Sequence, residues 1–316
     1  MLRIGNPNPL AVYNHPMFTR EINWAHHLLN IEEAWTSVTG KGVRVGVVDT
    51  GCDYTHDDLV GKVFGGINCT PNHDNGYMDS VGHGTSCASI IAARKTGKGV
   101  AGIAPDASLF IAKAVDDAGI GEAEYLKCAI ESCIAAECSV INVSLGSVEA
   151  YPEIEEVIQR GNDLGIIFVA AAGNSGDNKD GGPVILESDG LPLEDWPARL
   201  PYVISVAAIN KEGKVALWSS PGSIEFSAPG VDITTCFPGN KYAVFSGTSQ
   251  ASPFISGVCA LLKERNPNID MREAVKILDA HSLSIGASSQ YGAGIINVGS
   301  AVKALAKFKG GDRYGA

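Results

Sequence analysis

The stretch Val43-Arg44-Val45-Gly46-Val47-Val48-Asp49-Thr50-Gly51 is a mainly apolar run that ends abruptly in a carboxylate, a hydroxyl and a glycine. β-Branched residues with so little polar alternation are typical of a strand buried on both faces, as in a parallel sheet. We therefore predict a central strand over residues 43–48. Open α/β sheets collect functional groups where such strands end, so Asp49 is a candidate functional residue.

Further short apolar runs follow this one, and amphipathic segments separate them. The predicted strands cover residues 43–48, 109–115, 139–144, 166–171 and 203–208, and the predicted helices cover 83–93, 122–137, 153–163, 249–265 and 271–281. This alternation predicts a doubly wound α/β fold, in which a mainly parallel sheet carries helices on both faces. A single large domain is expected for the 316 residues.

The two ends of the chain differ from this central region. Residues 1–20 lack a helix or strand period and contain three prolines, so we interpret them as an N-terminal extension that lies over the domain. Residues 21–307 are assigned to the domain itself, and residues 308–316 are expected to be a flexible tail. The stretch 177–195 is interpreted as a surface loop near the functional face.

Composition excludes several classes of partner. The chain has 24 Lys and Arg against 35 Asp and Glu, a net charge of −11, so nucleic acid is not an expected partner. A membrane span needs about 18 consecutive apolar residues, and no stretch approaches that length. The eight cysteines are scattered without a CxxC pair, and residues 1–17 do not resemble a secretory signal. We therefore expect reduced thiols and a cytoplasmic setting.

Three short motifs carry side chains suited to catalysis. Asp49 follows the predicted strand, His83 lies in Gly82-His83-Gly84-Thr85 at the start of a predicted helix, and Ser249 lies among small residues at the start of another. Taken singly, they could be a turn aspartate, a structural histidine and a helix-capping serine. Together they supply an orienting carboxylate, a general base and a nucleophile in one chain.

These motifs, Asp49-Thr50-Gly51, His83-Gly84-Thr85 and Gly247-Thr248-Ser249-Gln250-Ala251-Ser252-Pro253, resemble the signature blocks of the subtilisin-like serine proteases. Ser144-Leu145-Gly146 and Ala170-Ala171-Ala172-Gly173-Asn174-Ser175-Gly176 are similar to two further blocks in the same order. The resemblance covers roughly residues 30 to 300 and is closest in layout to the intracellular branch. In that branch a short N-terminal segment often regulates activity, which makes residues 1–20 a candidate regulatory segment.

The resemblance implies a mechanism with named roles. Ser249 attacks a peptide carbonyl to form an acyl-enzyme, His83 transfers the proton, and Asp49 orients His83. The side-chain amide of Asn174 and the backbone N–H of Ser249 form the oxyanion hole. The expected activity is that of a serine endopeptidase of broad specificity.

Substrate recognition is expected to use an extended peptide strand. The strand would pair with Ser144, Leu145 and Gly146 on one side and with Gly119, Ile120 and Gly121 on the other. By the resemblance, Ala171 and Gly173 help to line the pocket for the P1 residue, which precedes the cut, and this suits an apolar side chain. Acidic residues on one rim and in the 177–195 loop leave a preference for basic substrate residues open, but we interpret them as solvated surface: Asp116, Asp117, Glu122, Glu124, Glu187 and Asp189.

The resemblance also bears on cofactors, on partners and on competing classes of protein. We expect catalysis to need no cofactor. A structural calcium ion is considered at Asp58, although the three cations of residues 94–98 would disfavour a dication there. The partners are protein or peptide substrates, with a homodimer considered by the resemblance. An aspartic protease is rejected because a single Asp-Thr-Gly leaves the other motifs unexplained. A non-catalytic peptide-binding relative is the competing class.

Overall fold

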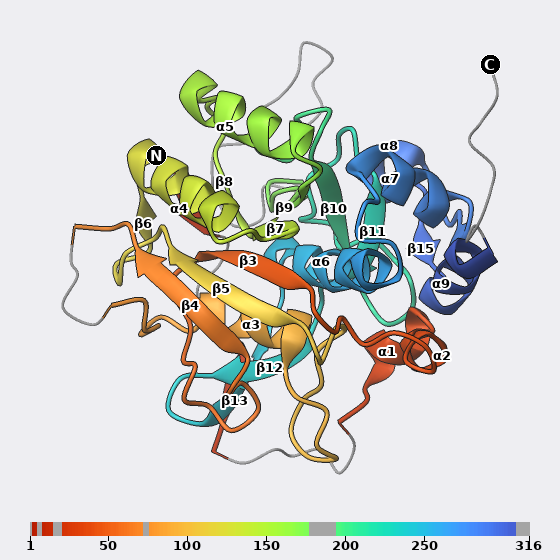
Figure 1. Ribbon diagram of the computed structural model, residues 1–316, viewed down its shortest axis with the longest axis horizontal. Helices are drawn as coiled ribbons and strands as arrows, with labels where there is room; N and C mark the ends of the chain where they lie inside the picture. The colour runs from red at the N-terminus through yellow and green to blue at the C-terminus, as the bar shows by residue number, and fades with distance from the viewer. Residues whose placement is uncertain (1, 5–7, 15–20, 72–75, 177–193, 308–316) are drawn as a thin grey trace.

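A nine-stranded sheet runs through the described part of the chain in the order β14-β15-β11-β10-β9-β7-β3-β5-β4 (Figure 1). The computed structural model describes residues 2–4, 8–14, 21–71, 76–176 and 194–307. The strands are β3 Arg44–Asp49, β4 Val63–Asn68, β5 Ser108–Lys113, β7 Val140–Val143, β9 Ile167–Ala171, β10 Ile204–Ile209, β11 Phe226–Pro229, β14 Ser282–Leu283 and β15 Ile295–Ile296. Neighbours pair in parallel except β14 with β15. The predicted α/β fold class is confirmed.

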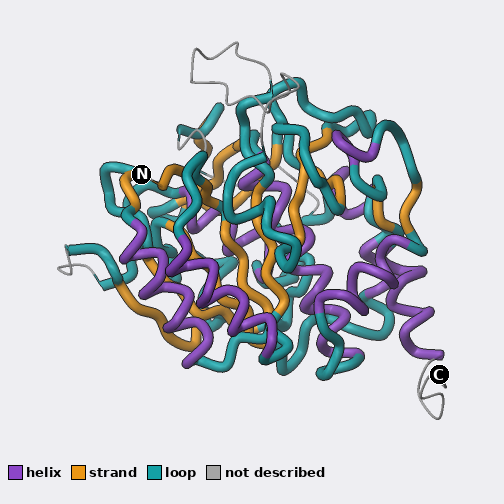
Figure 2. Tube along the Cα trace, turned by 90° about the horizontal axis from the view of Figure 1, so that it is seen from above, coloured by secondary structure: helices purple, strands orange, loops and turns teal. Residues whose placement is uncertain are grey.

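Helices cover both faces of this sheet (Figures 1 and 2). They are α1 Trp24–Leu28, α2 Ile31–Ala34, α3 His83–Ala92, α4 Ala123–Ala135, α5 Pro152–Asp163, α6 Thr248–Arg265, α7 Met271–Asp279, α8 Ser288–Tyr291 and α9 Val298–Lys307. Ile130 of α4 and Ile158 of α5 share an apolar cluster with Phe168 of β9, and Ile91 of α3 and Val258 of α6 share another with strand residues. The sheet thus lies between two apolar cores.

Helix α6 passes through the interior rather than along the surface. Every residue from Thr248 to Lys263 is buried, and the apolar side chains surround the helix instead of forming one stripe. Such a helix requires small residues where it meets its neighbours. A Cβ on Gly257, for example, would lie 2.6 Å from Cβ of Ile103. The small residues that begin α6 therefore let Ser249 lie deep within the molecule.

Two small sheets lie beside the main one, and both include part of the N-terminal extension. In one, β1 Leu2–Ile4 lies between β6 Ile120–Gly121 and β8 Leu145–Gly146. In the other, β13 Lys241–Phe245 lies between β12 Ile233–Phe237 and β2 Ala11–Tyr13, so the order is β12-β13-β2.

 
Strand β13 forms an antiparallel hairpin with β12. Its other edge pairs antiparallel with β2. Both strands of the extension are thus paired with segments far away in the sequence.

The cysteines correct one expectation from the sequence. Cys69, just after β4, and Cys128 of α4 form a disulfide, with Cα atoms 5.9 Å apart. The expectation of eight reduced thiols is therefore wrong for these two. The other six cysteines are free and buried. Sequence spacing could not reveal the pair, because the fold brings β4 and α4 together across 59 residues.

None of the helices in the described ranges is long and apolar enough to cross a membrane.

Candidate active site

Asp49 and His83 form a buried pair at the end of β3. Nδ1 of His83 lies 2.7 Å from Oδ1 of Asp49, and the two side chains are 1% and 0% exposed. Burial lowers the pKa of His83, but the charge and hydrogen bond of Asp49, with a contribution from Asp79, raise it by more, so the net pKa is raised. Nε2 of His83 is buried without a hydrogen-bond partner among the described residues. The histidine is therefore oriented at one nitrogen and available at the other.

Asp79 fixes the start of α3, the helix that carries His83. Its Oδ1 accepts hydrogen bonds from the hydroxyl of Thr50 at 2.9 Å and from the backbone N–H groups of Val81 and Gly82. Its Oδ2 accepts from the N–H and the hydroxyl of Thr85, at 2.9 and 2.6 Å. A carboxylate near a helix N-terminus satisfies otherwise unpaired N–H groups. The sequence did not single out Asp79 as a site residue.

Ser249 lies in the first turn of α6, beside the segment that follows β7. Its hydroxyl donates to the carbonyl oxygen of Ser144 at 3.0 Å, and the Ser144 hydroxyl donates to the carbonyl oxygen of Ser249, also at 3.0 Å. The thiol of Cys87 donates to that same Ser249 carbonyl at 3.3 Å. Cys87 Sγ also lies within 4.8 Å of the ligand atoms of Asp49 and His83. The fold thus brings Ser249 to the Asp49–His83 pair.

Asn174 follows β9 and faces the start of α6. Its Oδ1 accepts hydrogen bonds from the backbone N–H and the hydroxyl of Thr248, at 3.0 and 3.1 Å. The Thr248 hydroxyl also accepts from the N–H of Gly173 at 3.2 Å. With its oxygen held in this way, the side-chain amide nitrogen of Asn174 is left for another acceptor. It can stabilise negative charge near Ser249.

The strand residues expected to bind substrate lie on the two sides of β1. Gly121 and Ile120 of β6 pair with Leu2 and Arg3, and Gly146 and Leu145 of β8 pair with Arg3 and Ile4, all antiparallel. Gly119 lies in the turn before β6, with φ of +79°. The position between the two segments is therefore built for an extended strand, and residues 2–4 of the same chain occupy it.

Ala171 and Gly173, the residues expected to line the P1 pocket, lie at and just after the end of β9. Ala171 is buried and Gly173 has φ of +106°. The side chain of Asp195 lies against Gly173: a Cβ on that glycine would be 2.6 Å from Cγ of Asp195. Asp195 closes the stretch interpreted as a surface loop, of which residues 177–193 lie outside the described residues. The sequence therefore missed Asp195, although its place beside the apolar Trp196-Pro197 was a signal.

Asp58 does not join this group. Its Oδ2 accepts from the N–H of Val100 at 3.0 Å and the hydroxyl of Tyr242 at 2.9 Å, and the thiol of Cys236 lies 4.0 Å away. Calcium requires a shell of oxygen ligands, whereas this carboxylate faces hydrogen-bond donors. The arrangement does not fit a calcium ion, so Asp58 is explained as a hydrogen-bond acceptor in the core.

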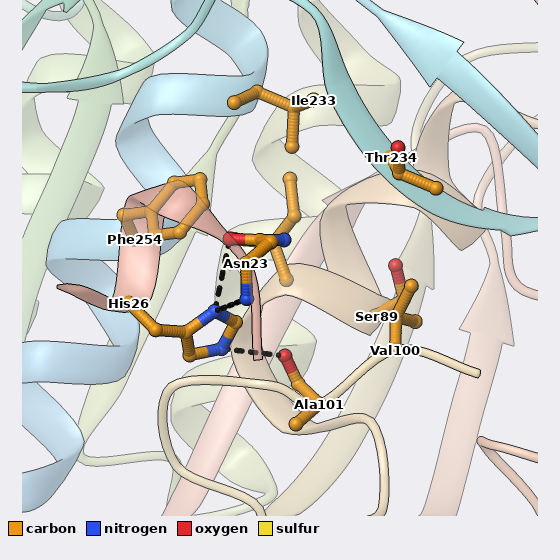
Figure 3. Close-up of a pocket in the computed structure, with 9 residues that line it drawn as sticks. Asn23, His26, Ser89, Val100, Ala101, Ile233, Thr234 and Phe254 are labelled. Atoms are coloured by element: carbon orange, nitrogen blue, oxygen red, sulfur yellow. Dashed lines mark hydrogen bonds between the residues drawn. The ribbon is translucent and has the colours of Figure 1, made fainter. Parts of the chain in front are cut away.

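A small pocket lies further along α3 and α6 (Figure 3). His26 lies at this pocket; its Nε2 donates to the carbonyl oxygen of Ala101 at 3.1 Å, and its Nδ1 accepts from the backbone N–H of Asn23 at 3.3 Å. Burial lowers the pKa of His26 to about 4, so the ring is neutral. Both of its nitrogens already have partners, and we assign no chemistry to this pocket.

Comparison with known proteins finds similarity over most of the chain. Residues 40–294 match the subtilase family. Subtilisin E of Bacillus subtilis is 36% identical over 266 residues, which cover 84% of this chain and 67% of that protein. A thermostable alkaline protease of Halalkalibacterium halodurans is 34% identical over 302 residues, covering 94% and 79%. An intracellular serine protease of Paenibacillus polymyxa is 36% identical over 260 residues, covering 81% and 77%.

The fold and the matches define a serine-type endopeptidase, a hydrolase of peptide bonds. The chain belongs to the subtilase family. Members of this family catalyse hydrolysis without a cofactor.

Proposed function

We propose that this chain hydrolyses peptide bonds in extended or unfolded polypeptides, with Ser249 as nucleophile, His83 as general base and Asp49 as the group that orients His83. The observation that carries the proposal is the buried His83–Asp49 pair, with 2.7 Å between Nδ1 and Oδ1. Because Oδ1 of Asp49 receives Nδ1–H, Nε2 is the nitrogen that accepts a proton. Rotation of the Ser249 hydroxyl away from the Ser144 carbonyl would present that proton to Nε2.

The oxyanion of the tetrahedral intermediate would be stabilised by the Asn174 side-chain amide and the backbone N–H of Ser249. Support comes from the contacts of Asn174 Oδ1 with Thr248, which orient the amide before substrate binds. Ser249 lies in the first turn of α6, where the backbone N–H groups and the helix dipole favour negative charge. His83 would then return the proton to the leaving amine, and water would release the acyl group by the same route.

A serine-directed fluorophosphonate tests the nucleophile. We expect covalent labelling of the chain, with loss of labelling and of peptide hydrolysis in Ser249→Ala. Ser246→Ala, three residues earlier, is the matched control, since its hydroxyl contacts only Asp232 among the described partners. A chain that binds peptides but is never labelled would instead be a non-catalytic binding relative.

The N-terminal segment is proposed to inhibit the enzyme by occupying the substrate strand position. The support is that β1 pairs antiparallel with both β6 and β8, the segments expected to bind substrate. Leu2 is fully buried and Ile4 is 8% exposed. A substrate strand and residues 2–4 cannot pair with the same backbone groups at once, so substrate must displace β1.

We also propose a cytoplasmic location for the protein. The likeness to a protein named an intracellular serine protease supports a cytoplasmic location. The disulfide between Cys69 and Cys128 argues in the other direction, because disulfides are rare in reducing compartments. A homodimer stays a prediction from the resemblance.

A further inference from the structure

We propose that Asp195 gives this protease a preference for a basic residue, arginine or lysine, at P1. The inference rests on the proposed function, because it assigns a substrate class to the same cleft. It replaces the apolar preference that was expected from Ala171 and Gly173 alone.

The position of the Asp195 carboxylate is the first argument. A Cβ built on Gly146 would lie 2.8 Å from Cβ and 2.9 Å from Oδ2 of Asp195. A Cβ on Gly173 would lie 2.7 Å from the same Oδ2. The carboxylate therefore lies between Gly173, which is expected to line the P1 pocket, and Gly146, which belongs to the segment expected to pair with the substrate strand. Because both of these residues are glycines, neither has a side chain that would separate the carboxylate from a bound P1 residue.

The lack of a partner is the second argument. In the ranges that the structure describes, neither carboxylate oxygen of Asp195 has a hydrogen bond or an ion pair. Arg199, the nearby cation, donates instead to the carbonyl oxygen of Val148 at 3.3 Å. The Asp195 backbone N–H bonds to the carbonyl of Ala172 at 2.8 Å, which fixes the residue against the end of β9. The carboxylate is held in place, and no cation of the described residues is bonded to it.

The chemistry of such a group favours a cationic side chain. A guanidinium or ammonium group supplies charge-assisted hydrogen bonds to a carboxylate. An apolar P1 side chain would remove water from the carboxylate without replacing those bonds, which is unfavourable for a buried charge. The site thus selects for a basic residue and against an apolar one through the same group.

The preference should depend on pH. Burial raises the pKa of Asp195 to about 7; the charge of Arg199 opposes this shift and that of Glu194 adds to it. The carboxyl is therefore neutral well below pH 7 and ionised above it. The ratio of kcat/KM for basic against apolar P1 substrates should rise as the pH increases through this range. The ratio cancels the titration of His83, which both kinds of substrate share.

Hydrolysis of a peptide series that differs only at P1 tests the proposal on the full chain. We expect arginine and lysine to be preferred over leucine and phenylalanine, and Asp195→Asn to lower kcat/KM for the basic substrates about 10- to 100-fold with no loss for the apolar ones. Glu122→Gln is the matched control, because it removes one exposed negative charge from the cleft rim. An apolar preference that Asp195→Asn leaves unchanged would overturn the proposal.

Binding of benzamidine, a small aromatic cation, separates this inference from the proposed mechanism. We expect calorimetry to detect binding to the intact chain and to Ser249→Ala, but not to Asp195→Asn. Absence of binding to both the intact chain and Ser249→Ala would overturn the role of Asp195. Binding to a chain that hydrolyses no peptide and takes no fluorophosphonate label would instead contradict the catalytic proposal alone.

Discussion

Oδ1 of Asp49 lies 2.7 Å from Nδ1 of His83, and the two side chains are almost completely shielded from solvent. This contact raises the pKa of His83 against the opposing effect of burial. A general base must be unprotonated, so activity should increase with pH through a value above that of an ordinary histidine.

Asp49→Asn should lower kcat about 10⁴-fold, because the amide no longer selects the tautomer or stabilises the imidazolium. The residual activity should reach its plateau at lower pH, since the charge of Asp49 no longer opposes the effect of burial, which lowers the His83 pKa. The pH dependence of kcat/KM in both proteins measures this. If kcat/KM falls at the same acidic pH in both proteins, Asp49 does not raise the pKa of His83.

Asn174→Ala should reduce kcat about 10²- to 10³-fold, which corresponds to about 2.7–4 kcal/mol of transition-state stabilisation. KM and the unfolding temperature should change little. Asn268→Ala, at an exposed turn, is the control and should retain full turnover. Steady-state kinetics test this role of Asn174 in the oxyanion hole, and unchanged turnover in Asn174→Ala would contradict it.

Leu2→Asp should activate the enzyme, because a carboxylate at a fully buried position disfavours the docked form of β1. We expect kcat/KM on a short peptide to rise about tenfold or more. Leu10→Asp, at a side chain that is 60% exposed, should have little effect. Equal activities in the three proteins would show that β1 does not compete with substrate.

Reduction of the Cys69–Cys128 disulfide should destabilise the fold by up to about 4 kcal/mol, the chain-entropy value for a loop of this length. Thermal unfolding with and without a reductant measures the change. The double variant Cys69→Ser/Cys128→Ser should unfold at a lower temperature than the intact chain and should not respond to reductant. If reductant still lowers the unfolding temperature of the double variant, the destabilisation does not come from this disulfide.

Asp58→Ala should cost about 3 kcal/mol, because it leaves buried donors, among them the Tyr242 hydroxyl, without their acceptor. The loss should be equal in calcium and in a chelator. Asp57→Ala, at the exposed neighbouring residue, should be nearly neutral. Protection by calcium in the intact chain that disappears in Asp58→Ala would instead support a metal ligand.

The elements predicted best from sequence are those whose own residues determine them. The apolar run 43–48 became β3, Arg44–Asp49, and the helix predicted from residue 83 begins at His83. The nearly continuous β-branched residues of β3 suit a strand that is buried on both faces, and the short apolar run leaves little freedom for where the strand ends. Asp49, His83 and Ser249 were predicted as catalytic residues because their motifs combine a reactive side chain with small neighbours.

The features that the sequence did not reveal depend on distant partners. Strand β1 has only three residues, too few to show a period, and it is stabilised by β6 and β8. Asp195 ends a polar stretch of sequence, which predicts an exposed residue. In the fold its side chain lies against Gly146 and Gly173. The pairing of Cys69 with Cys128 likewise requires the packing of α4 near β4.

The N-terminal extension is attached at two places, through β1 to β6 and β8 and through β2 to β13. If β1 inhibits as proposed, it acts at a fixed effective concentration, which does not fall when the protein is diluted. Inhibition should therefore be independent of enzyme concentration, and a separate peptide with the sequence of residues 2–13 would need millimolar amounts to match it. If β1 detaches, β2 keeps the segment close by, so the enzyme can return to its inhibited form once substrate is exhausted.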